Sequence, residues 1–170
     1  MRVIINNSIS LDGYISGQYG EEDWISEADE KYFEEACAEA DLILLGRGTY
    51  DANQGLYPIP GKLNVVFTQH VNKQQSNDSI VFTNEDPVSY IKKNKDKTIL
   101  VAGGGKLNAT ILKSGIVTDI VVCIHPIILG GGGTRQFEDI DHEVQTKLEK
   151  ISETDIGDEV VKIHYRVINT

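Results

Sequence analysis

The chain of 170 residues is 40% hydrophobic and 25% charged, a composition that is typical of a globular protein and excludes collagen-like, mucin-like and disordered chains. Its 26 acidic and 16 basic residues give a formal net charge of −10, which disfavours binding to the phosphate backbone of a nucleic acid. The 2 cysteines are too few for a disulfide framework, and no apolar run reaches the ~20 residues that cross a bilayer. We therefore expect one domain over residues 1–170, in the cytoplasm, with no nucleic-acid or membrane partner.

Strand and helix signals alternate in the first part of the chain. The β-branched run at residues 3–9 predicts a buried strand, and the long polar segment after it, residues 10–26, is of the kind that carries function. Ser26 and Asp29 have capping-box spacing, so we expect a helix to begin there. Its apolar stripe consists of Tyr32, Phe33, Ala36, Cys37 and Ala40. Residues 42–45 predict a second buried strand, which ends at a glycine.

The remaining elements follow the same alternation until the end of the chain. Short apolar runs predict strands at residues 64–68, 80–83, 98–102 and 119–124. Helices are expected from Asp86-Pro87, where a proline at the first helical position costs no hydrogen bond, and over residues 107–112. Residues 147–154 and 161–167 have the pattern of a terminal antiparallel hairpin. Together they predict a mixed α/β fold, with a mostly parallel sheet covered on both faces and a C-terminal antiparallel hairpin.

Two glycine-rich turns follow predicted strands. Gly103-Gly104-Gly105 lies between a strand and a helix, where backbone N–H groups can bind an anion; a tight structural turn is the alternative. Neither the P-loop nor the Rossmann spacing is present. The second turn, Gly46-Arg47-Gly48-Thr49, contains an arginine that can grip a phosphate, and Thr68 ends a third strand. Because ligands of open α/β sheets bind outside the carboxyl ends of strands, these three ends predict one extended site for a diphosphate ligand such as NADP.

Other features allow more than one interpretation. The glycine run at residues 130–133 lets a backbone pass close to a ligand or forms a strand-ending loop. Trp24, the single tryptophan, is a cleft wall or a hydrophobic plug over the core. General acid–base chemistry would come from the carboxylates of Asp12, Asp23, Asp29 and Glu30. We expect no metal site, because no metal-ligand spacing relates the histidines His70, His125, His142 and His164.

Five motifs, in this order, resemble the dihydrofolate reductase-like superfamily, and most closely its branch built on the reductase domain of bacterial riboflavin biosynthesis. They are Ser10-Leu11-Asp12-Gly13-Tyr14-Ile15, Leu45-Gly46-Arg47-Gly48-Thr49-Tyr50, Val65-Val66-Phe67-Thr68, Val101-Ala102-Gly103-Gly104-Gly105-Lys106-Leu107 and Pro126-Ile127-Ile128-Leu129-Gly130-Gly131-Gly132. The resemblance implies a three-layer sandwich with NADPH bound across the sheet. Thr68 would lie near the adenosine phosphate. The cofactor would be held by Gly46, Arg47, Gly48, Thr49, Gly103, Gly104, Gly105 and Lys106.

The resemblance also assigns the substrate side. Asp12 would stand at the start of the loop over the nicotinamide, where its side chain would either shape this loop or touch the substrate. Dihydrofolate reductases proper have an acidic residue at the spacing that Trp24, Asp29 and Phe33 reproduce. Asp29 is therefore the candidate substrate-side acid, and Trp24 a neighbour of the substrate. Lys62 stands where those enzymes have the arginine that grips the folate tail, and its lack of a planar guanidinium weakens a carboxylate clamp.

We therefore expect an NADPH-dependent reductase that transfers hydride to a C=N bond of a pyrimidine or pterin, with Asp29 or Glu30 as the substrate-side acid. The riboflavin-type branch implies a phosphoribosylated aminopyrimidine as substrate, although no zinc-ligand motif of the deaminase domain usually fused to it is present. The alternatives are a dihydrofolate reductase proper, an NADP-binding protein without catalysis, and a domain whose glycines only form turns. Relatives with such a tail often form homodimers, and we expect one here.

Overall fold

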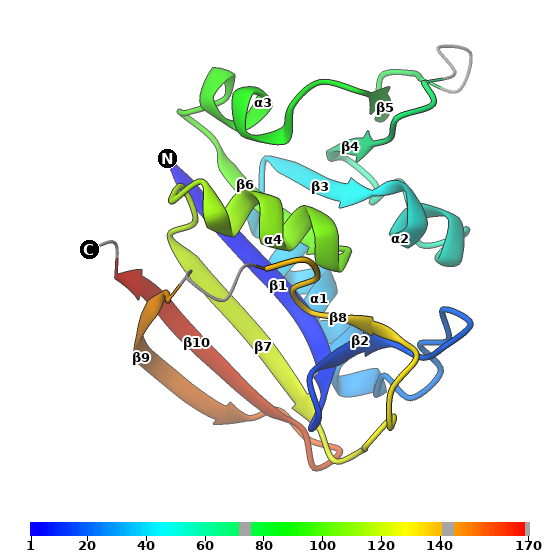
Figure 1. Cartoon of the computed structure of the whole chain (residues 1–170), viewed down its shortest axis with the longest axis vertical. Helices are drawn as coiled ribbons and strands as arrows, with labels where there is room; N and C mark the ends of the chain where they lie inside the picture. The colour runs from blue at the N-terminus through cyan, green and yellow to red at the C-terminus, as the bar shows by residue number, and fades with distance from the viewer. Residues whose placement is uncertain (72–75, 141–144, 169–170) are drawn as a thin grey trace.

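The central feature of the fold is one mixed sheet (Figure 1). Within residues 1–71, 76–140 and 145–168, which the computed structural model describes, 8 strands form it in the order β5-β4-β3-β6-β1-β7-β10-β9. The strands are β1 (Arg2–Ser10), β3 (Leu42–Gly46), β4 (Leu63–Phe67), β5 (Ile80–Thr83), β6 (Thr98–Gly103), β7 (Asp119–His125), β9 (Lys147–Asp155) and β10 (Val161–Ile168). Neighbours from β5 to β7 run parallel, whereas β10 is antiparallel to β7 and β9. The predicted mixed sheet with its terminal hairpin is therefore confirmed.

Helices cover both faces of this sheet, as Figure 1 shows for α1 behind it and α4 in front. They are α1 (Glu27–Glu39), α2 (Arg47–Ala52), α3 (Pro87–Lys93) and α4 (Gly105–Lys113). The Ser26 hydroxyl accepts a hydrogen bond from the Asp29 N–H at 3.3 Å, and the Asp86 carboxylate accepts one from the Ser89 N–H at 2.8 Å. Both side chains are N-caps, as the sequence predicts. Within the described residues, no helix is long and apolar enough to cross a membrane.

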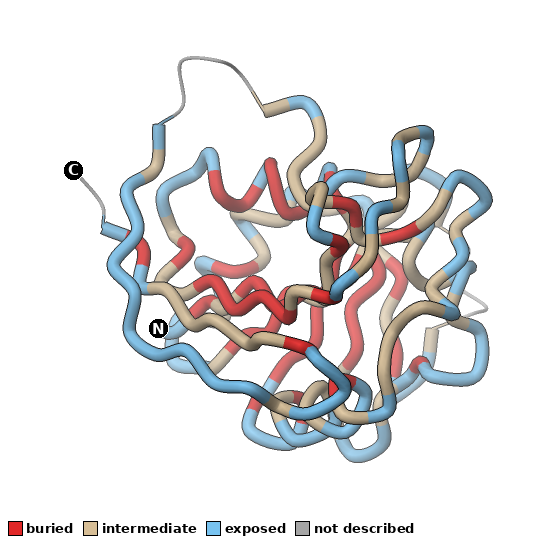
Figure 2. The backbone as a smooth tube through the Cα atoms, turned by 90° about the horizontal axis from the view of Figure 1, so that it is seen from below, coloured by how far each residue is buried: buried red, intermediate tan, exposed pale blue. Residues whose placement is uncertain are grey.

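The alternation of side chains along the central strands divides the core into two layers. In β3, Leu42 and Leu44 pack on the face that α3 and α4 cover, whereas Ile43 and Leu45 pack on the face that α1 covers. All of these side chains are 0% exposed, and the tube in Figure 2 is red along the central strands. The layers of helix, sheet and helix are the three-layer sandwich expected from the sequence.

The polar segment at residues 10–26 contains a strand that its sequence does not indicate. β2 (Tyr14–Ser16) pairs with β8 (Thr134–Arg135) in a separate, antiparallel two-stranded sheet. At this contact a Cβ on Gly133 would lie 2.0 Å from the carbonyl oxygen of Ser16. Only glycine fits this close approach of two backbones, so the glycine run has a structural role at the start of β8.

The hairpin strand β9 lies at an edge of the main sheet and is exposed at every residue. A β-bulge interrupts its pairing with β10 between His164 and Tyr165. Bulges and charged side chains protect exposed edges from uncontrolled pairing with other chains. The expected homodimer stays a prediction.

A buried asparagine fastens the loop that precedes β4. The Asn64 side chain is 0% exposed; it accepts from the Ile59 N–H at 2.9 Å and donates to the carbonyl oxygens of Lys62 at 2.9 Å and Ser79 at 3.2 Å.

We expect Asn64→Ala to lower the free energy of unfolding by about 2 kcal/mol, because buried backbone groups lose their partner. Urea unfolding measures this loss. The control is Ser79→Ala, which shortens an exposed side chain and keeps the backbone carbonyl that Asn64 binds. An equally small loss of unfolding free energy in both variants would contradict the role of Asn64 in holding this loop.

Candidate functional site

A cleft of about 940 Å³ opens where β3, β4 and β6 end. Its walls include the two predicted glycine turns, which contribute residues 46–49 and 104–106. The two turns are neighbours, because β3 and β6 pair in parallel and a Cβ on Gly46 would lie 3.4 Å from the Gly104 nitrogen. The small size of glycine leaves the backbone of both turns accessible from the cleft.

The N-terminus of α4 faces this cleft. Its N-cap residue, Gly104, makes no side-chain hydrogen bond, so no side chain caps the N–H groups of the first turn. Such groups, together with the positive end of the helix dipole, favour an anion. A Cβ on Gly104 would lie 3.2 Å from the Thr49 hydroxyl, so a larger residue would crowd the approach. Backbone donors beside a hydroxyl suit a phosphate group.

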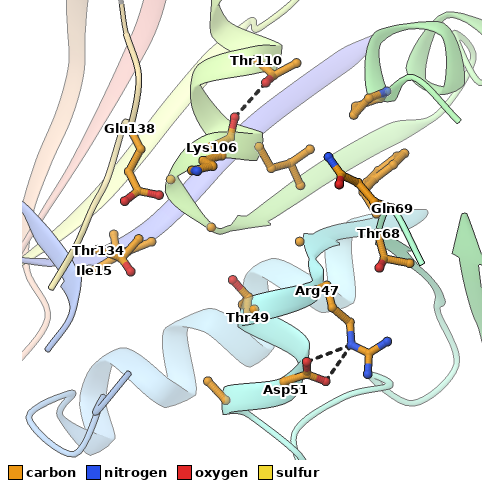
Figure 3. A pocket seen from close by; sticks show the side chains of 18 of the residues that line it. Ile15, Arg47, Thr49, Asp51, Thr68, Gln69, Lys106, Thr110, Thr134 and Glu138 are labelled. Carbon is orange, nitrogen blue, oxygen red and sulfur yellow. Dashed lines mark hydrogen bonds and ion pairs between the residues drawn. The ribbon is translucent and has the colours of Figure 1, made fainter. Parts of the chain in front are cut away.

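Two cations face the cleft from its helices (Figure 3). The Nε of Arg47 donates to both carboxylate oxygens of Asp51, at 2.8 and 2.9 Å, and these bonds engage one end of the guanidinium. The Lys106 ammonium lies 3.6 Å from the Asp139 carboxylate, and both side chains are exposed. Thr68 lines the same cleft beyond β4. Exposed ion pairs of this kind contribute little stability, so both cations can turn to a bound phosphate.

The structure brings together almost all residues predicted to bind the cofactor. Those that line the cleft are Gly46, Arg47, Gly48, Thr49, Thr68, Gly104, Gly105 and Lys106. Gly103 is the exception: it is buried at the end of β6, where a Cβ would lie 3.4 Å from the Asn7 side-chain nitrogen. The glycine turns and the two cations fit a diphosphate ligand, and the cleft is also lined by the carboxylates of Glu22, Asp51, Glu85, Asp86 and Glu138. The role of each residue in binding stays a prediction.

A smaller cavity of about 150 Å³ adjoins the cleft. Ile15, Glu22 and Thr49 line both spaces. The other residues of the cavity come mainly from α1, the central strands and the segment after α2: Asn6, Asn7, Ser8, Ile25, Asp29, Glu30, Phe33, Asn53, Leu56, Tyr57 and Ala102. One ligand in the cleft and another in the cavity would therefore meet at the shared wall.

Asp29, in the first turn of α1, is the buried carboxyl group of this cavity. Its exposed fraction is 2%, and Oδ2 has no hydrogen-bond partner within the described residues. His125 Nε2 lies 3.5 Å from that oxygen, but it accepts a hydrogen bond from the Ser26 N–H at 3.2 Å. The other ring nitrogen, Nδ1, lies 3.2 Å from the carbonyl oxygen of Cys123, which can only accept, so Nδ1 carries the proton. His125 therefore has no proton on Nε2 to donate to Asp29.

Glu22 is a second carboxyl group, at the wall that the cleft and the cavity share. Burial raises the pKa of Glu22, and a hydrogen bond with Asn53 acts in the opposite direction. The sequence analysis missed this residue, because only its packing distinguishes it from the exposed Asp23 in the same loop. Glu30, the alternative to Asp29, also lines the cavity but is exposed.

Two residues expected near the substrate support the site without lining the cavity. The Asp12 carboxylate accepts hydrogen bonds from the Ser10 hydroxyl at 2.7 Å and from the Gly130 N–H at 2.9 Å. Trp24 packs edge-on against His125, with ring centroids 5.1 Å apart. Asp12 therefore shapes the first loop, and Trp24 covers the histidine as a hydrophobic plug.

Lys62, the residue expected to contact the substrate tail, binds the C-terminal end of α1. Its ammonium group donates to the carbonyl oxygens of Ala38 at 2.6 Å and Ala40 at 2.7 Å, at the C-terminal end of α1. A cation at this end of a helix binds carbonyl groups that lack helical partners and interacts favourably with the negative end of the helix dipole. Lys62 lines neither the cleft nor the cavity, and its predicted contact with the substrate stays a prediction.

The remaining sequence features lie outside both spaces. A Cβ on Gly132 would lie 3.3 Å from the Gln18 side chain, so the glycine run packs against the first loop, and it lines neither the cleft nor the cavity. No group of three or more His, Cys, Asp or Glu side chains in the described part of the chain could hold a metal ion. His142 lies outside the described residues.

Comparison with known proteins extends this description. A sequence model of the family described as RibD C-terminal domain matches residues 1–57 and 59–162. The uncharacterised protein YyaP of Bacillus subtilis is 28% identical over an alignment of 164 residues, and the match covers 86% of this chain and 86% of YyaP. A protein of Shewanella sp. PV-4 named for riboflavin biosynthesis has a TM-score of 0.82 at 23% identity, covering 99% of this chain and 100% of that one. Dihydrofolate reductase of Enterococcus faecalis, in complex with NADP(H), has a TM-score of 0.74 at 18% identity, covering 99% and 97%. The dihydrofolate reductase-like fold is thereby confirmed.

The anchoring of the first loop by Asp12 predicts a pH-dependent stability. The Ser10 hydroxyl, followed by the Gly130 and Leu129 N–H groups, lowers the pKa of Asp12 from 3.8 to about 2. A lowered pKa in the folded state stabilises the protein above pH 3.8, and this contribution is lost as the pH falls towards 2. We expect Asp12→Asn to unfold at a lower temperature than the unchanged protein at neutral pH, and the difference to disappear near pH 2.

Thermal unfolding across this pH range measures the effect of Asp12→Asn. Asp23→Asn, an exposed carboxylate of the same loop, is the matched control and should show no such pH dependence. Equal unfolding temperatures for Asp12→Asn and the unchanged protein at neutral pH would contradict the anchoring role.

Proposed function

The chain belongs to the RibD C-terminal domain family, and from that premise we propose that it is an NADPH-dependent reductase that transfers hydride to a C=N bond of a pyrimidine- or pterin-like ring. One observation carries this proposal: the glycine-lined cleft and the cavity of Asp29 share a wall at Ile15, Glu22 and Thr49. A cofactor in the cleft and a ring in the cavity would meet at that wall, with the close placement that hydride transfer requires.

The residues of the cleft fit NADPH. The glycine turns and the N-terminus of α4 would hold the cofactor phosphates, with Arg47 as a cationic partner and Thr68 near the adenosine phosphate. The bound cofactor supplies the hydride. The likeness to a dihydrofolate reductase in complex with NADP(H) supports this choice of cofactor.

Asp29 would handle the proton. Addition of hydride to the carbon of a C=N bond leaves an electron pair on nitrogen, which takes up a proton and becomes an N–H group. The Oδ2 of Asp29 has no partner within the described residues, so it can orient a ring N–H and pass a proton directly or through water. Phe33 and Tyr57 line the same cavity and would limit the access of water.

A dihydrofolate reductase proper is the less favoured candidate. That assignment calls for a cationic clamp on the carboxylates of the folate tail, and Lys62 holds the end of α1. An NADP-binding protein without catalysis is the other alternative, and it differs from our proposal in the absence of hydride transfer.

Asp29→Asn tests the reductase proposal. We expect the single-turnover rate of NADPH oxidation to fall ~100-fold or more, because the variant cannot supply the proton, while the affinity for NADPH is unchanged. Stopped-flow absorbance of the reduced nicotinamide, with dihydropterin and aminopyrimidine acceptors, measures the rate. Glu30→Gln changes an exposed carboxylate of the same cavity and is the matched control.

Three outcomes of this test would count against parts of the proposal. An unchanged rate in Asp29→Asn would remove Asp29 from the chemistry. A loss of the rate in Glu30→Gln alone would assign the acid to Glu30. Binding of NADPH by the unchanged protein, without oxidation by any of these acceptors, would establish binding without reductase activity.

A further inference from the structure

Glu22 is the charged residue at the wall between the cleft and the cavity. Among the described residues, three line both spaces, and the other two are Ile15 and Thr49, which Figure 3 labels. A cofactor in the cleft and a substrate ring in the cavity would bring their reacting atoms together at this wall. The side chain of Glu22 is the one there that carries a charge.

Contacts with two segments hold Glu22 in this position. Its carbonyl oxygen accepts a hydrogen bond from the Ile25 N–H at 3.0 Å, within the first loop. Its side chain has a hydrogen bond with Asn53, the residue that ends α2. The Asn53 Nδ2 also donates to the carbonyl oxygen of Thr49 at 3.1 Å. Asn53 therefore joins the carboxylate of Glu22 to the helix that supplies Thr49 to the same wall.

The carboxylate of Glu22 has no counter-ion within the described part of the chain. The ion pairs formed there do not include it. The cations of the cleft have other partners, because Arg47 pairs with Asp51 and Lys106 with Asp139. Glu22 is half-buried, and this burial raises the pKa of its carboxyl group. A carboxylate that is shielded from water and lacks a cation gains most from positive charge on a ligand.

Hydride transfer from a reduced nicotinamide creates positive charge at this wall. A C–H bond of the nicotinamide breaks with its electron pair, a C–H bond forms at the carbon of the substrate C=N bond, and the nicotinamide is left with a positive charge. The substrate nitrogen takes up its proton on the side of Asp29. A group that interacts more strongly with the positive ring than with the neutral one stabilises the transition state more than the reactants.

Resting on the reductase function proposed above, we propose that Glu22 is a further catalytic residue, whose carboxylate lies against the nicotinamide ring and stabilises the positive charge that hydride transfer leaves there. This contact favours bound NADP⁺ over bound NADPH and so makes the bound cofactor a stronger reductant. The two carboxyl groups then have separate roles: Glu22 acts on the cofactor ring, and Asp29 acts on the substrate nitrogen.

Binding of the two cofactor forms tests the contact without any substrate. NADPH and NADP⁺ carry the same phosphates and differ at the nicotinamide ring, so the ratio of their dissociation constants isolates interactions with the charge of the ring. Glu22→Gln removes the charge and keeps the size of the side chain and an oxygen for Asn53. We expect it to weaken NADP⁺ relative to NADPH about tenfold, which raises the reduction potential of the bound couple by about 30 mV. Titration calorimetry on the full chain measures both constants.

Glu138→Gln is the matched control for this ratio. Glu138 lines the cleft but not the cavity, and a Cβ on Gly105 would lie 2.7 Å from its Cγ, so it lies beside the N-terminus of α4. Loss of its charge should change the affinities for both cofactor forms alike, because both carry the same phosphates. An unchanged ratio in Glu22→Gln, or the same shift in both variants, would overturn the contact of Glu22 with the ring.

Single-turnover oxidation of NADPH tests the catalytic part of the proposal. We expect Glu22→Gln to slow hydride transfer about tenfold with dihydropterin or aminopyrimidine acceptors, because the transition state loses its stabilising charge. Deuterium at the transferred position of NADPH establishes, through the isotope effect, that the measured step is hydride transfer. A rate equal to that of the unchanged protein would overturn the catalytic role.

The two readouts separate the role of Glu22 from the reductase function. A shifted ratio without NADPH oxidation by the unchanged protein would support the contact of Glu22 with the ring, but contradict the reductase function and with it the catalytic role. NADPH oxidation together with an unchanged ratio in Glu22→Gln would overturn the role of Glu22 and leave the reductase function standing. Failure of both cofactor forms to bind the folded protein would overturn both.

Discussion

The close approach of β3 and β6 at their carboxyl ends is the constraint on which the site depends. The two strands are parallel neighbours, and a Cβ on Gly46 would lie 3.4 Å from the Gly104 nitrogen. Glycine at these positions lets both strands turn into helices beside one another, with their backbones open to one cleft. The cations of α2 and α4 then follow at the rim of this cleft, and Asp29 lies in the adjoining cavity.

The position of Asp29 depends in turn on how α1 is held at both ends. Ser26 caps its first turn and also donates its N–H to His125 of β7, which joins the start of the helix to the sheet. Lys62 binds the carbonyl oxygens at the other end. Helix α1 therefore places a carboxyl group against the sheet, and the contacts that fix the helix also engage the ammonium group of Lys62. Rigid support of this kind is what a hydride acceptor needs to be held in one orientation.

Most of the fold could be predicted because its signals are local. The caps at Ser26 and Asp86 lie within one turn of the helices they begin, and the glycine turns directly follow their strands. The pairing of β2 with β8 has no local signal in the sequence, because it joins segments that lie far apart in the chain. Glu22 was missed for the same reason, because its burial comes from packing and not from its neighbours in the chain. The position of Lys62 allows a substrate clamp or a contact with α1, and only the placement of that helix decides between them.

Titration calorimetry with NADPH, and with NADH in parallel, decides most directly whether the glycine-lined cleft is a cofactor site. We expect saturable binding of NADPH in the micromolar range and weaker binding of NADH, because Arg47 and Thr68 offer contacts to the additional phosphate. Circular dichroism on the same sample establishes that the protein is folded. Absence of binding by both cofactors to the folded protein would contradict the account, and would leave the two glycine turns as parts of the architecture alone.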